Sequence, residues 1–279
     1  MYFDEQRTID EIAVRLGCGA TTIARRLRRA GIMARRRGPN PARYVPRSGC
    51  TLPAVGWSPQ TAWVVGLLAT DGNLSRTKRL SITSKDRDLL ETVKVCLGLT
   101  NAVGICMNGR GQRYSKLQWG DRRFYEWLTV VGLTPAKSLT LGPLLIPDAY
   151  FADFFRGCID GDGSVLVYTD RYHTRKKERY IYERLYVSLV SASRPFIEWT
   201  QRCVLRLAGV KGSITVRSSN GRNPLWKLRY AKAESIRVLR WMYYEPAGPA
   251  LARKRVIAAP FLTPRARPPR RGPGRPMVV

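Results

Sequence analysis

The sequence lacks the residues that most histidine, zinc and disulfide chemistry requires. His173 is the only histidine among 279 residues, which excludes a nuclease built on a histidine base with His or Cys metal ligands. The six cysteines are scattered and include no CxxC pair, so neither a zinc site nor a disulfide scaffold is expected. We predict buried free thiols, and any catalysis must use carboxylates, lysines and metal.

Long apolar runs and a secretory signal are also missing. No stretch of about 18 apolar residues occurs, so no membrane span or membrane partner is expected, and the N-terminus lacks the regions of a signal peptide. We expect an intracellular protein, cytoplasmic or nucleoid-associated. Arginine outnumbers lysine 38 to 11, which suits phosphate and guanine recognition and equally fits a bacterium or phage with GC-rich DNA.

Acidic residues are few. Twenty Asp and Glu stand against 49 Lys and Arg, which gives a net charge of +29. Such a charge indicates a polyanionic partner, and nucleic acid is the leading one. The hydrophobic content of 44% and aromatic content of 10% are sufficient for a packed core.

Residues 7–32 predict two short helices joined by the turn GCG, because apolar residues recur at helical spacing on both sides of it. Thr8 and Glu11 are spaced for a capping box. The stretch resembles a helix-turn-helix of the resolvase or small-repressor kind; the alternative is a basic helical hairpin that packs on the main domain. We assign residues 1–33 to this helix-turn-helix and 34–57 to a basic Pro/Gly linker or DNA-tracking arm.

The C-terminal residues 263–279 form a basic Pro/Arg-rich tail that cannot build a core. Its GRP triplet suggests a contact in a DNA minor groove. The alternative is a solvated basic tail.

An internal repeat fills the chain between these ends. GLLATDG (66–72) and GCIDGDG (157–163) both begin with glycine and end with Asp-Gly at the same spacing. Downstream, the stretch 81–99 matches 188–210. Each copy reads helix, two strands, helix, two strands, helix, which predicts an α+β unit with antiparallel strands and helices on one sheet face. The first repeat spans 58–147 and the second spans 148–262.

Four glycines in the two motifs predict how the copies meet. Gly66 and Gly157 each cost about 1 kcal/mol within a helix relative to alanine, which makes sense if the two motif helices cross so closely that a Cβ would clash. We predict that Gly72 and Gly163 adopt the left-handed conformation that ends a helix.

Asp71 and Asp162 follow apolar helices directly, where unpaired carbonyls and the helix dipole disfavour a carboxylate. If the helices cross side by side, the two carboxylates emerge together at the open sheet face and repel each other unless cations lie between them. Hard divalent cations such as Mg²⁺ are the expected occupants.

With these motifs the sequence resembles the LAGLIDADG homing endonucleases in their single-chain, two-motif form, over residues 58–260. The resemblance implies a pseudo-twofold, duplicated αββαββα fold with antiparallel DNA-binding sheets, and a monomer that uses Mg²⁺ with Mn²⁺ as a possible substitute. It implies that the lysines polarise water or stabilise the phosphorane, and that the serines position water. The implied catalytic residues are Asp71, Asp162, Lys137, Lys254, Ser84 and Ser191, and the implied metal ligands are Asp71, Asp162 and the backbone carbonyls of Thr70 and Gly161.

The first motif departs from the family in one place. Ala69 stands where the second motif has the acidic residue Asp160. We expect a capping or packing position there, so the change does not imply lost activity.

Basic residues alternate with tyrosines in the hairpin at 168–189, a pattern that suits a two-stranded ribbon in the major groove; the alternative is a solvated charged ribbon. The turn 217–224 and the second N-terminal helix add further basic edges. The predicted DNA-binding residues are Thr21, Thr22, Arg25, Arg26, Arg29, Arg171, Arg175, Lys176, Lys177, Arg179, Arg184, Arg217, Arg222, Lys227 and Arg229.

The resemblance favours a site-specific homing endonuclease that makes a metal-dependent double-strand break with staggered ends in a long pseudo-palindromic target, promoting mobility of a host intron or intein-like element. Two alternatives use the same scaffold. A non-cleaving transcription regulator would account for the helix-turn-helix, and an RNA maturase that binds intron RNA would account for the high charge.

Overall fold

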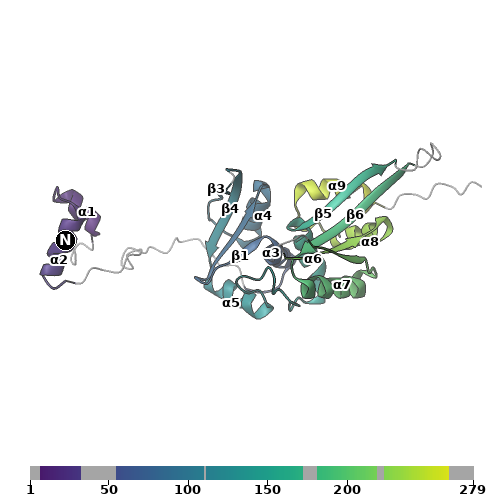
Figure 1. The fold of residues 1–279 in the computed structure, drawn as a ribbon, viewed down its shortest axis with the longest axis horizontal. Helices are drawn as coiled ribbons and strands as arrows, with labels where there is room; N and C mark the ends of the chain where they lie inside the picture. The colour runs from purple at the N-terminus through teal and green to yellow at the C-terminus, as the bar shows by residue number, and fades with distance from the viewer. Residues whose placement is uncertain (1–6, 33–54, 110, 172–180, 219–222, 264–279) are drawn as a thin grey trace, which may run out of the picture. The chain divides into compact units, whose positions relative to one another are not determined.

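The computed structural model describes residues 7–32, 55–109, 111–171, 181–218 and 223–263. The chain divides into two compact units, one within residues 1–50 and the other within residues 51–279 (Figure 1). Each unit is described by itself below.

The N-terminal unit is a pair of short helices, α1 (Ile9–Arg15) and α2 (Ala20–Arg29). Ile12, Ala13 and Ile23 form its small buried core. The two helices predicted from the sequence are therefore present.

The predicted capping box at the start of α1 is confirmed. The backbone N–H of Glu11 donates to Thr8 Oγ1 at 3.2 Å, and the backbone N–H of Thr8 donates to Glu11 Oε2 at 2.9 Å. These two bonds satisfy donors that the first turn of a helix leaves unpaired, so the sequence sets this helix start locally.

The larger unit contains two copies of one αββαββα order, which confirms the predicted α+β class. The first copy consists of α3 (Pro59–Thr70), β1 (Gly72–Leu74), β2 (Arg79–Ser84), α4 (Arg87–Leu97), β3 (Gly104–Met107), β4 (Arg113–Gly120) and α5 (Arg122–Val131). A 3₁₀ turn, Asp148–Tyr150, leads into the second copy. That copy consists of α6 (Phe151–Asp160), β5 (Gly163–Asp170), β6 (Tyr182–Ser191), α7 (Arg194–Ala208), β7 (Ser213–Arg217), β8 (Leu225–Tyr230) and α8 (Lys232–Met242), and α9 (Ala252–Leu262) follows it.

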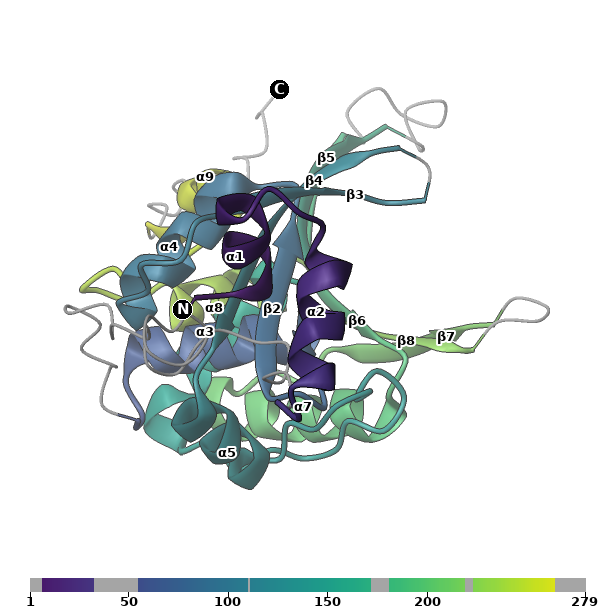
Figure 2. The same cartoon turned by 90° about the vertical axis from the view of Figure 1, so that its left-hand side faces the viewer.

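Each copy forms a four-stranded antiparallel sheet, in the orders β1-β2-β4-β3 and β5-β6-β8-β7. The registers correspond, because Gly72 pairs with Ile82 in the first sheet and Gly163 pairs with Leu189 in the second. Helices α4 and α5 pack on the first sheet, and α7 and α8 pack on the second. In Figure 2 the hairpin β3–β4 and the hairpin β7–β8 both extend beyond the helices.

The larger unit has one continuous hydrophobic core that joins the two copies through α3 and α6. Nine residues of α3, from Thr61 to Ala69, are buried, and every residue of α6 is buried. Figure 1 shows both helices between the two sheets. None of the described helices is both long and apolar enough to cross a membrane.

The expectation of buried free thiols is half right. The five cysteines in the described residues form no disulfide, but only Cys158 is buried, and Cys18, Cys96, Cys106 and Cys203 are partly exposed. The sixth, Cys50, lies outside the described residues.

Candidate nucleic-acid cleavage site

The two motif helices cross at a pair of glycines, as the sequence predicts. A Cβ built on Gly66 would lie 2.1 Å from the carbonyl oxygen of Phe154, and one built on Gly157 would lie 2.1 Å from the carbonyl oxygen of Trp63. No side chain fits at such distances, so the close contact of α3 and α6 requires glycine on both helices.

The predicted left-handed conformation of Gly72 and Gly163 is wrong. Neither has a positive φ angle; each is the first residue of a strand, β1 and β5 respectively. A Cβ on Gly72 would lie 2.5 Å from Leu68 Cα, and a Cβ on Gly163 would lie 2.5 Å from Ile159 Cα. Glycine is needed because the strand starts directly against the last turn of its own motif helix.

The crossing brings Asp71 and Asp162 together. Asp71 is the C-terminal cap of α3, and Asp162 follows Gly161, the cap of α6. The carboxyl groups are close enough to share a hydrogen bond. Both residues are exposed at the surface. The pKa of Asp71 is nevertheless raised to about 6, mainly because its carboxyl group is partly desolvated and secondly because the charge of Asp162 lies nearby. Desolvation also raises the pKa of Asp162. The pair therefore carries unfavourable negative charge at neutral pH.

Lys254, on α9, supplies positive charge to the end of α6. Its side chain is buried, with 3% exposed, and Nζ donates to the carbonyl oxygens of Ile159 at 2.5 Å, Asp160 at 2.9 Å, Gly161 at 3.3 Å and Gly163 at 2.8 Å. An ammonium group has three N–H donors, so main-chain oxygens occupy all of them. Burial lowers the pKa of Lys254 to about 8.

Lys137 plays the corresponding part in the first copy with fewer contacts. It lies in a turn rather than a helix, is buried, and donates from Nζ to the carbonyl oxygen of Gly72. Burial lowers its pKa, whereas the charges of Asp162 and Asp71 act in the opposite direction. The two lysines thus offset both the helix-end carbonyls and the carboxylate pair.

Ser84 and Ser191 occupy matching positions at the ends of β2 and β6. Ser84 Oγ accepts from the backbone N–H of Asp86, and Ser191 Oγ accepts from the backbone N–H of Ser193, both at 3.1 Å. Each hydroxyl therefore stabilises the turn from strand to helix. Each lies two residues beyond the strand residue that pairs with a motif glycine.

The donor atoms around the carboxylate pair suit a hard cation. The described residues contain no group of three or more His, Cys, Asp or Glu side chains that could hold a metal by themselves. Two carboxylates with main-chain carbonyls fit Mg²⁺, which takes few protein ligands and keeps water and phosphate oxygens for the rest. The Thr70 hydroxyl donates to the carbonyls of Gly66 and Leu67, so its side chain is already used within α3. The Gly161 carbonyl accepts from Lys254 but has a second lone pair that a metal ion could use.

Basic and aromatic side chains lie on the strand face of the second sheet that the helices leave open. Tyr168 and Tyr186 stack with ring centroids 6.2 Å apart, and the Arg229 guanidinium lies 5.0 Å from the Tyr186 ring. The Arg184 guanidinium lies 5.5 Å from the Tyr182 ring and bonds to Asp170.

The same face continues across β7 and β8. In the antiparallel pairing of β7 with β8, Arg217 lies opposite Leu225, Thr215 opposite Lys227, and Ser213 opposite Arg229. Alternation along the strands therefore places Arg217, Lys227 and Arg229 on one face. All three are among the residues for which the sequence predicts a DNA contact.

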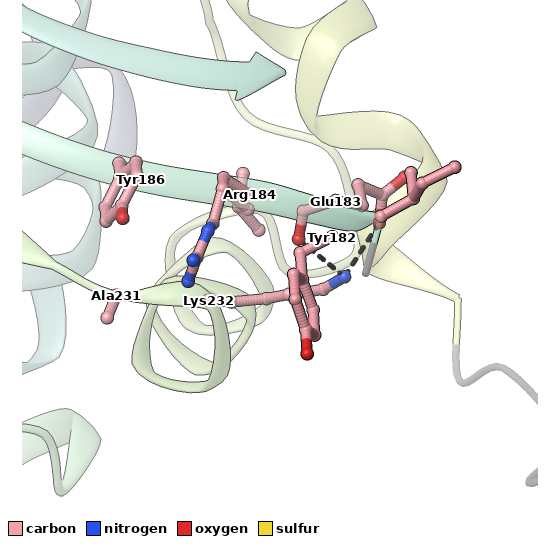
Figure 3. A pocket seen from close by; sticks show the side chains of 8 residues that line it. Tyr182, Glu183, Arg184, Tyr186, Ala231 and Lys232 are labelled. Atoms are coloured by element: carbon pink, nitrogen blue, oxygen red, sulfur yellow. Dashed lines mark hydrogen bonds and ion pairs between the residues drawn. The ribbon is translucent and has the colours of Figure 1, made fainter. Parts of the chain in front are cut away.

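Beyond the end of β8, the free edge of β6 borders a pocket lined by eight residues, including Tyr182, Arg184 and Tyr186 (Figure 3). Lys232 closes this edge, because its Nζ donates to both the carbonyl and the side-chain carboxylate of Glu183 at 3.0 Å. Lys232 is the first residue of α8, so this helix covers the strand edge, and a covered edge is less open to pairing with another chain.

Several predicted DNA-binding residues belong to other parts of the chain. Arg171 directly follows the end of β5. Thr21, Arg25, Arg26 and Arg29 are exposed on α2, and Thr22 there is partly exposed. Arg175, Lys176, Lys177, Arg179 and Arg222 lie outside the described residues.

The sequence did not reveal the hydrogen bonds that hold the C-terminal end of α6 in place. Asp160 is buried, and its Oδ2 accepts from Trp63 Nε1 and from the backbone N–H of Leu251, both at 2.9 Å. These bonds join α6 to α3 and to the start of α9, which carries Lys254. Asp160 is thus a packing position, as expected. The signal that the sequence offered is an acidic residue within a mainly apolar helix, because such a residue needs partners if it is buried.

The comparisons with known proteins agree with this fold. Residues 150–240 match the family model described as LAGLIDADG-like domain. No curated protein matches the sequence.

Three of the solved structures that this chain is similar to share little sequence identity with it. The I-LtrWI LAGLIDADG homing endonuclease bound to target DNA is 14% identical, with a TM-score of 0.48 over 73% of this chain and 89% of that chain. The meganuclease I-AabMI bound to uncleaved DNA is 15% identical, with a TM-score of 0.48 over 74% and 89%. Full-length DUF199/WhiA from Thermatoga maritima is 12% identical, with a TM-score of 0.44 over 74% of this chain and 63% of that chain. Residues 150–240 therefore form a LAGLIDADG-like domain, and they lie within a larger unit that contains the order αββαββα twice.

Proposed function

We propose that this protein is a site-specific DNA endonuclease that makes a Mg²⁺-dependent double-strand break with staggered ends in a long pseudo-palindromic target. The observation that carries the proposal is the pair Asp71 and Asp162, forced together by the glycine crossing of α3 and α6. Each carboxyl group belongs to one copy of the fold, so each copy would cleave one of the two DNA strands.

The carboxyl groups of Asp71 and Asp162 would hold Mg²⁺, or Mn²⁺ in its place, with help from the carbonyls of Thr70 and Gly161. A bound divalent ion would supply an activated water and neutralise charge on the scissile phosphate. Lys254 and Lys137 stabilise added negative charge at the site through their own positive charge. Because the N–H donors of Lys254 already bind carbonyls, we assign it electrostatic stabilisation rather than direct polarisation of water.

The open sheet faces would bind the DNA. Arg217, Lys227 and Arg229 share one face of the second sheet, and strands of this kind can enter a major groove about 12 Å wide. Two sheets related by an internal repeat fit a long target with related halves. Mobility of a host intron or intein-like element is the biological role that we propose for such cleavage.

A cleavage assay on a randomised target library tests the proposal. Protein with Mg²⁺ should produce staggered double-strand breaks, and Asp71→Asn and Asp162→Asn should each lose at least about 100-fold in rate, the scale on which removal of charge stabilisation acts. Both variants should still bind the selected duplex in EDTA. Asp148→Asn, a control on the exposed Asp148–Arg206 ion pair, should cleave normally.

Binding of the ion can be measured without activity. Mg²⁺ should raise the melting temperature of the wild-type protein and of Asp148→Asn, because an ion that binds the folded state stabilises it. It should leave the two motif variants unchanged. Equal shifts in all four proteins would contradict the proposed metal site.

A non-cleaving transcription regulator is the second candidate, favoured by the separate basic helix pair at the N-terminus. In that case the protein binds a defined duplex but cuts none with Mg²⁺ or Mn²⁺, and the motif variants bind as the wild type does. Selective binding of intron RNA over duplex DNA would instead identify a maturase.

A further inference from the structure

Two equivalent turns of the larger unit reach across to the opposite copy of the fold. Each joins the second strand of its copy to the helix that follows: Asp86 lies between β2 and α4, and Ser193 lies between β6 and α7. The two residues occupy matching places, because the backbone N–H of each donates to the serine two residues before it, Ser84 or Ser191. The side chain of each, however, binds a residue of the other copy.

Asp86, in the first copy, binds the helix that carries Lys254 of the second copy. Arg253 Nε donates to both carboxylate oxygens of Asp86, to Oδ1 at 3.2 Å and to Oδ2 at 3.0 Å. Arg253 directly precedes Lys254 on α9. Asp86 is the N-cap residue of α4, but its side chain makes no capping hydrogen bond there. Its carboxylate therefore serves the contact between the two copies rather than its own helix.

Ser193, in the second copy, binds the turn that carries Lys137 of the first copy. Its Oγ donates to the carbonyl of Leu141, and the backbone N–H of Leu141 donates to the carbonyl of Lys137 at 2.8 Å. All three residues are buried, so water does not compete for these bonds. The contact from Ser193 should therefore hold its turn more firmly than the partly exposed pair of Asp86 and Arg253 holds α9.

We propose that Asp86 and Ser193 are positioning residues, each for the lysine of the opposite copy: Asp86 for Lys254, and Ser193 for Lys137. A lysine side chain is long and flexible, so the position of its ammonium group depends on where its backbone is held. Each ammonium group contacts the main chain at the end of the motif helix of its own copy, whereas a turn of the other copy holds the backbone nearby.

Each half of the cleavage site is then complete only when both copies are in place. The inference rests on the proposed function in that the lysines affect a rate only if the protein cleaves DNA. Misplacing a group in such a site by about 1 Å can slow a reaction about 100-fold. Loss of Asp86 or Ser193 should therefore slow cleavage of one strand, the strand that the other copy cuts.

Cleavage of the two strands is measured separately to test the proposal. A duplex target selected from the library carries a different dye on each strand, and single-turnover rates are measured with Mg²⁺ and an excess of the full-length protein. Lys137→Met and Lys254→Met identify the strand that each lysine serves. Asp86→Ala should slow the same strand as Lys254→Met, by about 10-fold, and Ser193→Ala should slow the same strand as Lys137→Met by at least as much.

Asp121→Ala is the matched control. Asp121 caps α5 by accepting from the backbone N–H of Phe124 at 3.0 Å, a bond within the first copy, and Ser193 also caps its helix, α7. The control loses a helix cap and should leave the ratio of the two strand rates unchanged.

The proposal is overturned if Asp86→Ala or Ser193→Ala leaves the strand ratio unchanged, or if either slows the strand that the lysine of its own copy serves. It is equally overturned if the lysine variants slow both strands alike, because the lysines then do not serve one strand each.

Urea denaturation without metal separates this proposal from the proposed function. If the wild type cuts no duplex with Mg²⁺ or Mn²⁺, the proposed function fails, and stability still decides whether the residues are coupled. Asp86→Ala combined with Lys254→Met should lose less stability than the sum of the single losses, because the lysine contributes less once α9 is no longer held; Ser193→Ala with Lys137→Met should do the same. The same-copy pairs, Asp86 with Lys137 and Ser193 with Lys254, should be additive. Additive losses in the pairs that join the two copies would overturn the proposal.

Discussion

Gly66 and Gly157 face each other at the crossing of α3 and α6: a Cβ added to Gly66 would lie 2.9 Å from Gly157 Cα, and one added to Gly157 would lie 3.1 Å from Gly66 Cα. Main-chain atoms form this contact, so no side-chain rearrangement can relieve a clash. The spacing of the two carboxylates depends on the same contact, because Asp71 and Asp162 lie at the ends of these helices.

We therefore predict that Gly66→Ala and Gly157→Ala each lower the free energy of unfolding by about 3 kcal/mol or more, since overpacking against the backbone forces the helices apart. In a unit of this size that corresponds to a fall in Tm of roughly 6 to 12 °C. Thermal unfolding measures it. Gly142→Ala is the control, because a Cβ there meets no atom within 4 Å; an equal loss in the control would contradict the packing argument.

The carboxylate pair predicts an unusual pH dependence of stability without metal. The pKa of Asp71 is about 6 in the folded protein, against an ordinary value of 3.8. The folded state therefore holds a proton that the unfolded state releases between these values, and the resulting stability is present below about pH 4 and lost as the pH rises through 6. Asp71→Asn removes this loss.

In EDTA, Asp71→Asn should accordingly melt a few degrees above the wild type at pH 7.5 and close to it at pH 4, as followed by thermal unfolding across this range. Asp148→Asn should behave in the opposite sense. Its hydrogen bond to Arg206 lowers the pKa of Asp148, so the wild-type carboxylate stabilises the fold at neutral pH. A Tm difference for Asp71→Asn that does not change with pH would contradict the assigned shift.

The two buried lysines should differ in their importance for stability. Lys254→Met leaves four main-chain oxygens without the ammonium group, whereas Lys137→Met leaves one. Each hydrogen bond to a charged group is worth about 1.5 to 3 kcal/mol, so Lys254→Met should lower the free energy of unfolding clearly more than Lys137→Met. Urea denaturation measures both, with the exposed Lys211→Met as control. Equal losses, or the reverse order, would refute this reading of the lysines.

The features that the sequence predicts well are those with a local or repeated cause. The duplicated Asp-Gly frame indicates two matched units, and glycine within an apolar helix indicates a close crossing, because little else accounts for its cost there. The capping box of Thr8 and Glu11 is likewise a local rule. The carboxylate pair follows from these features, since the chain brings Asp71 and Asp162 to the ends of the crossing helices.

The features that the sequence does not reveal depend on distant parts of the chain. Gly72 was expected to be left-handed, because a glycine after a helix usually is; the structure instead starts a strand there, and contact with Leu68 excludes a Cβ. The carbonyl partners of Lys254 lie more than 90 positions away in sequence, so no local pattern could show that its donors are already used. Similarly, the ties from Asp160 to Trp63 and Leu251 exist only once α3, α6 and α9 have packed.

A buried ion pair within α6 supports the last prediction. Arg156 Nη2 lies 2.5 Å from Asp153 Oδ1, and the two side chains are 1% and 0% exposed. Arg156 Nε donates to the carbonyl of Pro249 at 2.8 Å, and Tyr244 Oη donates to Asp153 Oδ2 at 2.9 Å. The pair thus fastens α6 to the segment that leads into α9 and Lys254.

Removing one partner leaves an uncompensated buried charge, so Arg156→Met should lower the free energy of unfolding by about 3 to 5 kcal/mol. The double variant Asp153→Asn, Arg156→Met should recover part of this loss, because the remaining group is neutral and still bonds to Tyr244. Urea denaturation of both single variants and the double variant gives the coupling energy. Arg122→Met is the control, since its ion pair with Glu126 is exposed and should contribute nothing measurable. A double variant no more stable than Arg156→Met would show that the arginine acts through its main-chain bonds to Pro249 and Met242 rather than by neutralising Asp153.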